Sequence, residues 1–82
     1  MIINLSDLAE AQSRLAAGEL PYEFRTSDPA LRITGPASGF GAEYLERCRK
    51  NGLYAASMEE ALVIARARNV TITGVWFVKG QS

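Results

Sequence analysis

The segment from residue 70 to residue 79 constrains the fold of this chain more than any other. It is rich in β-branched and aromatic residues, which favour strands, and it predicts the longest strand of the protein. Gly74 lies inside this segment at a position where a β-bulge is expected. A strand of this character needs partner strands and a covering layer of helices. The rest of the sequence must therefore supply both.

Three segments carry the signals of helices. The first covers about residues 7–17 and follows Ser6, which is expected to be its N-cap. The second covers about residues 42–51, where apolar side chains recur on one side. The third begins with Ser57 and Glu60, whose spacing is that of a capping box. These segments predict three short amphipathic helices.

The remaining apolar segments predict strands. Residues 2–5 form a short candidate strand, and residues 22–26 and 31–34 alternate apolar and polar side chains on either side of the turn at 27–30. The resulting fold class is α+β, with a single antiparallel sheet of three to four strands packed against two to three helices. The element order approximates a ferredoxin-like βαββαβ arrangement whose second helix is broken. Residues 53–56 are either a linker or a short strand.

The length of 82 residues fits one α+β domain that spans residues 1–82. The loosest stretch is the Gly-rich segment at residues 35–41, which we expect to be a mobile loop. It lies between a strand and a helix, where phosphate-binding loops occur. Ala42 and Glu43 follow it, however, instead of the lysine and hydroxyl that a P-loop requires.

The composition excludes several kinds of chemistry. The chain has no histidine, which removes histidine-dependent catalysis and histidine metal ligands. Its single cysteine, Cys48, is expected to be a buried thiol outside any disulfide or metal site. Nine basic and nine acidic residues give a formal net charge of zero. We therefore expect no enzymatic activity, no cofactor and no metal. The lone cysteine and the absence of a signal peptide or membrane segment point to the cytoplasm.

Alternation along the last strand divides its side chains between two faces. It predicts that Trp76 faces the helices, whereas Val75 and Phe77 lie on the opposite face beside Arg25 and Arg32 of the hairpin. Apolar side chains ringed by polar ones are typical of a protein contact surface. The alternative is that a helix also covers this face, or that both aromatic residues belong to the core.

A second candidate surface consists of arginines at the ends of two helices. Arg47 lies near the end of the second helix, and Arg66 and Arg68 lie near the end of the third. They form one basic patch if these two helix ends meet in the fold. Favourable interaction with the helix dipoles accounts for the same charges without any ligand.

These observations favour a non-enzymatic protein-interaction module. Such a protein acts as a small inhibitor, adaptor or accessory protein that covers the surface of another protein, and bacterial or phage-encoded inhibitors of host systems are one class of this size. The partner-binding residues would be Phe77, Val75, Arg25, Arg32, Arg47, Arg66 and Arg68. The alternative is a nucleic-acid-associated regulator that uses the basic helix ends or the open sheet face. A homodimer through the last strand or the open face is also compatible with the sequence, and no membrane partner is expected.

Overall fold

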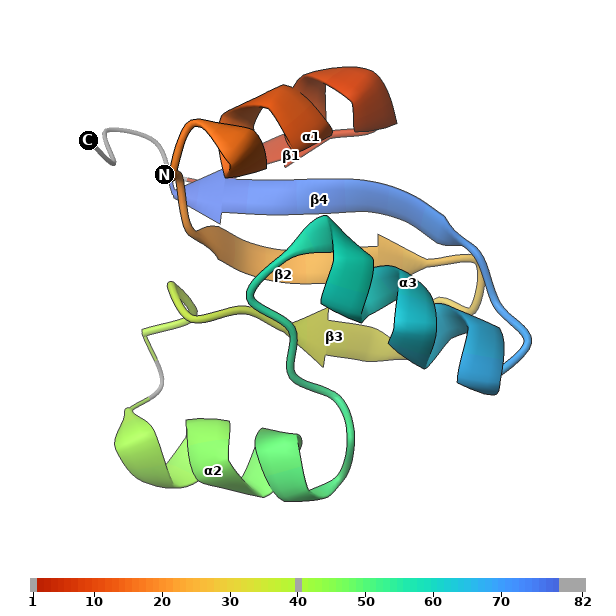
Figure 1. The fold of residues 1–82 in the computed structure, drawn as a ribbon. Coiled ribbons are helices and arrows are strands. Elements are labelled where there is room, and N and C mark those ends of the chain that lie inside the picture. Colours follow the sequence, from red (N-terminus) through yellow and green to blue (C-terminus); the bar gives the residue numbers. More distant parts are fainter. Residues whose placement is uncertain (1, 40, 79–82) are drawn as a thin grey trace.

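The computed structural model describes residues 2–39 and 41–78, so residue 40 of the predicted loop and residue 79 of the predicted last strand lie outside the described part. The predicted α+β class is confirmed, because the structure contains helices and one antiparallel sheet (Figure 1). In chain order the elements are β1 (Ile2–Leu5), α1 (Leu8–Ala16), β2 (Pro21–Thr26), β3 (Arg32–Thr34), α2 (Ala42–Lys50), α3 (Met58–Ala67) and β4 (Ile72–Val78).

The four strands lie in the order β1-β4-β2-β3, and each is antiparallel to its neighbours. β4 is therefore an interior strand and β1 is an edge strand. In a ferredoxin-like sheet the first strand lies in the interior, so the predicted ferredoxin-like arrangement is not confirmed. β4 is the longest and most apolar strand, and its interior position gives it a hydrogen-bonded neighbour on each side.

Helices α1 and α3 lie on the same side of the sheet, while α2 lies beyond the edge formed by β3 (Figure 1). The core fills the space between these two helices and the sheet. Its buried members are Ala11, Phe24, Ile33, Ala55, Met58, Ala61, Ala65, Ile72, Val75 and Phe77. Small alanines on α1 and α3 allow the helices to approach the larger side chains of the sheet closely.

The side chains of β4 point to faces opposite to those predicted. Val75 and Phe77, expected on an open face, are 0% exposed and belong to the core, whereas Trp76 is only half-buried. The cause is a shift in the pairing of β4 with β2, which leaves Thr73 as an extra residue. This bulge lets Ile72 and Val75 face the same side, which simple alternation forbids. The prediction that Val75 and Phe77 contact a partner from an open face is therefore wrong in its placement of both residues.

The helix caps agree with the sequence in part. α1 is capped by Asp7, whose carboxylate accepts hydrogen bonds from two backbone amides of the first turn, and not by Ser6. The Ser57 hydroxyl caps α3 by accepting from the Glu60 amide at 3.2 Å, as predicted. The Glu60 carboxylate accepts from the backbone of Ala56 at 3.1 Å, one residue before the cap itself. Both caps satisfy amide groups that a helix start leaves without partners.

Residues 53–55 run along the outer edge of β3. The Thr34 amide donates to the Leu53 carbonyl at 2.8 Å, and the Ala55 amide donates to the Thr34 carbonyl at 3.0 Å. Thr34 and Tyr54 thereby form a parallel bridge. Residues 53–56, predicted to be either a linker or a short strand, thus contribute a single bridge to the sheet. This bridge covers the outer edge of β3, which would otherwise expose unpaired backbone groups.

The first half of the Gly-rich loop follows β2. The Gly35 amide donates to the Tyr22 carbonyl and the Ala37 amide donates to the Pro21 carbonyl, both at 3.0 Å. Gly35 is buried, and a Cβ atom added to it would overlap the carbonyl oxygen of Pro21. The mobility of the loop at residues 35–41 stays a prediction.

Truncation of Phe77 tests whether this side chain lies in the core and not, as predicted from the sequence, on the open side of β4. Because its ring is fully buried between the sheet and the helices, Phe77→Ala should lower the free energy of unfolding by about 3–5 kcal/mol, as large-to-small core substitutions do. Val78→Ala removes a half-buried neighbour and should cost no more than about 1.5 kcal/mol. Urea denaturation followed by circular dichroism measures both. Equal, small losses would contradict the assignment of Phe77 to the core.

Candidate interaction surface

The sheet face opposite α1 and α3 carries a row of side chains from three strands. Asn4 of β1 is paired with Trp76 of β4, and Trp76 is paired with Glu23 of β2. We call this surface the open face. By strand register it consists of Ile2, Asn4, Glu23, Arg25, Arg32, Thr34, Gly74, Trp76 and Val78. Asn4 and Arg32 are exposed, so no helix covers this part of the sheet.

Trp76, Arg25 and Glu23 form a stacked group at the centre of the open face. The guanidinium carbon of Arg25 lies 4.1 Å from the centroid of the Trp76 ring, within cation–π distance. The Nε atom of Arg25 lies 2.9 Å from Oε2 of Glu23, and the two side chains are only 27% and 13% exposed. Ring and carboxylate together hold the guanidinium in one place, so a contact with it would cost less side-chain entropy than a contact with a free surface arginine.

A shallow hollow of about 330 Å³ lies beside this stacked group. Its lining residues are Asn4, Ser6, Arg25, Thr26, Pro29, Thr73, Gly74 and Trp76. Gly74 pairs with Arg25 and carries no side chain, which leaves space next to the ring. A Cβ atom at Gly74 would lie 3.3 Å from Oδ1 of Asn4, so the hollow depends on glycine at this position. The volume is at the lower end of the range of ligand pockets.

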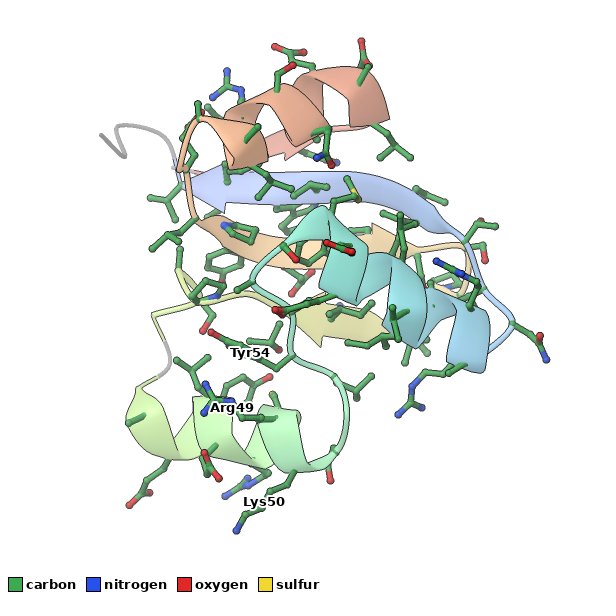
Figure 2. The ribbon with its side chains drawn as sticks, viewed as in Figure 1. Arg49, Lys50 and Tyr54 are labelled. Carbon is green, nitrogen blue, oxygen red and sulfur yellow. The ribbon has the colours of Figure 1, made fainter. Side chains whose placement is uncertain are left out.

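Helix α2 shields the open face only where β3 ends. The hydroxyl of Thr34 lies 3.3 Å from Sγ of Cys48, and both residues are buried. The predicted burial of this thiol is confirmed, and the thiol is free. Arg49 of the same helix extends toward Tyr54, with its guanidinium carbon 4.8 Å from the ring centroid, whereas Lys50 extends away from the sheet (Figure 2).

The structure brings the C-terminal ends of α2 and α3 together. The Nη2 atom of Arg68 donates a hydrogen bond to the carbonyl of Asn51, the residue that follows α2, at 3.0 Å. Arg47 and Arg66 are exposed and form no ion pair within residues 2–39 and 41–78. The side chain of Arg68 therefore links the two helix ends, and a basic patch of Arg47, Arg66 and Arg68 stays a prediction.

The predicted contact residues thus separate into three groups. Arg25 and Arg32 are paired on the open face, where the sequence placed them. Val75 and Phe77 lie in the core, and the three helix-end arginines lie outside the open face. Sequence reasoning missed Trp76 as the centre of the face. Gly74, a candidate bulge directly before Val75, was the signal that alternation along β4 is broken.

Neither the described residues nor the comparisons with known proteins point to another kind of site or to a family. In the described part of the chain, no three potential metal-ligating side chains lie together, and no helix there has the length and apolar character needed to cross a bilayer. No protein-family model matches the sequence, and neither the curated proteins nor the solved structures include a match.

The two arginines at the end of α3 allow a structural role to be separated from a binding role. Arg68→Ala should lower the free energy of unfolding by about 1 kcal/mol, because the Asn51 carbonyl loses a charged donor. Arg66→Ala removes the same charge without a hydrogen bond and should change stability by less than about 0.5 kcal/mol. Thermal and urea unfolding of both variants measure this difference, and equal stabilities would show that the link between the helix ends contributes nothing.

Proposed function

We propose that the protein is a non-enzymatic interaction module that covers the surface of another protein with its open face. It would act as a small inhibitor, adaptor or accessory protein, of which a bacterial or phage-type inhibitor of a host system is one example. The observation that carries this proposal is the position of Trp76, half-buried under Arg25 at the centre of a sheet face without a helix. Tryptophan and arginine are the residue types most enriched in the energetic centres of protein interfaces.

The surroundings of Trp76 also favour a protein contact. Asn4, Arg32 and Thr73 are exposed around it, so a half-buried aromatic centre has a polar rim, as in protein interfaces. Among the described residues, the only ionisable group that lines the hollow is the guanidinium of Arg25, which supplies no general acid or base at neutral pH. This supports a binding role over catalysis. With its single thiol buried, the protein suits a reducing compartment, and we place it in the cytoplasm.

Exchange of one exposed residue at the hollow tests the proposal. Thr73→Glu places a long carboxylate side chain beside Trp76 and Arg25 and should weaken a partner complex about tenfold or more. Gln12→Glu makes the same charge change on an exposed position of α1, on the other side of the sheet, and should leave the complex intact. The measurement is quantitative affinity capture from the source cells, followed by titration of the captured protein in purified form.

The expected result is a partner retained by the wild type and by Gln12→Glu but lost from Thr73→Glu, with unchanged unfolding curves for all three. Retention of every captured protein by Thr73→Glu would contradict contact through the open face.

The second candidate function is binding of nucleic acid through the basic helix ends. The observation that favours it is the proximity of the ends of α2 and α3, where Arg47, Lys50 and Arg66 are exposed. If it is correct, a fluorescent single-stranded oligonucleotide binds at about 50 mM salt and is released as salt increases. Arg47→Glu with Arg66→Glu should then abolish binding, while Thr73→Glu should not. Absence of binding at low salt excludes this function, because phosphate contacts are strongest there.

A further inference from the structure

The hollow on the open face has the lining of a site for an anionic group. Among the described residues, the only charged side chain that lines it is that of Arg25. Glu23, its ion-pair partner, contacts the Nε side of the guanidinium and does not line the hollow. The charged group at the hollow is therefore a cation, although Glu23 balances its charge and the whole chain has a formal net charge of zero.

Hydrogen-bond donors surround this charge without acceptors of their own. The side chains of Asn4, Ser6 and Thr73 line the hollow and make no hydrogen bond to residues in the described ranges. The indole Nε1 of Trp76 is buried and also has no acceptor there. Buried donors are normally paired, so an unpaired one next to a hollow calls for an acceptor from outside the chain.

The position of Arg25 suits a carboxylate in particular. Its ring contact with Trp76 and its ion pair with Glu23 hold the guanidinium plane, and neither contact uses its terminal nitrogens. Arginine pairs with carboxylates through two parallel hydrogen bonds when its terminal nitrogens are free. Apolar surface from Pro29 and the Trp76 ring lines the same hollow and can contact the methylene groups that carry a carboxylate.

We propose that this hollow binds an aspartate or glutamate side chain of the partner protein. The inference rests on the proposed function and specifies its chemistry: the partner presents an acidic residue to Arg25 at the centre of the contact. The opposite face of the sheet, packed against α1 and α3, plays no part in this recognition.

The test uses the fact that Trp76 is the only tryptophan of the chain, so its indole N–H gives a single assigned signal in a ¹⁵N NMR spectrum. The full chain is titrated with a blocked Gly-Glu-Gly tripeptide and, separately, with a blocked Gly-Gln-Gly tripeptide. The expected result is a saturable shift of the indole signal by the glutamate peptide, with affinity about tenfold or more above that of the glutamine peptide. One charge-assisted hydrogen-bonded pair accounts for a difference of that size.

Two matched variants identify the group responsible. Arg25→Gln should remove the preference for the glutamate peptide, whereas Arg32→Gln should keep it. Both variants lose one positive charge from the open face, and the two residues are paired on adjacent strands, but only Arg25 lines the hollow. Arg25→Gln leaves Glu23 without its partner. The double variant Glu23→Gln with Arg25→Gln is therefore measured as well, and an unfolding curve is recorded to test that it is folded.

Three results would overturn the inference. These are equal affinity for the two peptides, absence of any shift by either peptide, and the same loss of preference in Arg32→Gln as in Arg25→Gln. A shift of the indole signal by oligo-dT, with none by the glutamate peptide, would also overturn it and assign the hollow to phosphate. In contrast, failure of the proposed function appears as unchanged partner capture by Thr73→Glu, so the two failures are distinguishable.

Discussion

The β-bulge at Thr73 determines how the rest of the protein is arranged. β4 is paired on both sides, and its side chains supply much of the core and also the centre of the open face. With one extra residue in the strand, Ile72 and Val75 both face the helices, and Trp76 faces away from them. Had the strand continued without a bulge, Trp76 would lie under α1 and α3, and the smaller Val75 would lie outside. The bulge at Thr73 thus keeps Trp76, the largest apolar side chain of the protein, at the surface.

The distribution of the helices follows from the same arrangement. α1 and α3 use alanines to cover Phe24, Val75 and Phe77, and this one layer buries the large side chains of the sheet. α2 is not needed for that layer and lies at the β3 edge, where the segment after it pairs with Thr34. A chain of this length has too few residues for a second helical layer. Among the described residues, one sheet face therefore stays open, and it is the surface that we propose contacts a partner.

The contacts of the arginines differ, and they explain how a chain of zero net charge can present a positive charge at one place. Arg14 pairs with Glu19 at 3.3 Å, and Arg68 links the ends of two helices, so both have structural contacts. Arg25 also has a carboxylate partner, but it is the one arginine among the residues that line the hollow. Its charge acts locally because Trp76 and Glu23 hold it beside uncharged donors. The proposed selectivity of the open face for an acceptor group depends on where this charge lies and not on the total charge.

The sequence alone determined the elements and their class. Periodicity and capping residues placed the three helices and four strands to within a few residues, because these signals depend on neighbours two to four positions apart. It also located Arg25 and Arg32 on a common face, since a hairpin imposes its own register. Only the tertiary structure decided the strand order, the faces of β4 and hence the role of Trp76. Pairing of β4 with β1 and β2 joins segments far apart in the chain, and the bulge that arises from this pairing cannot be positioned by alternation within one strand.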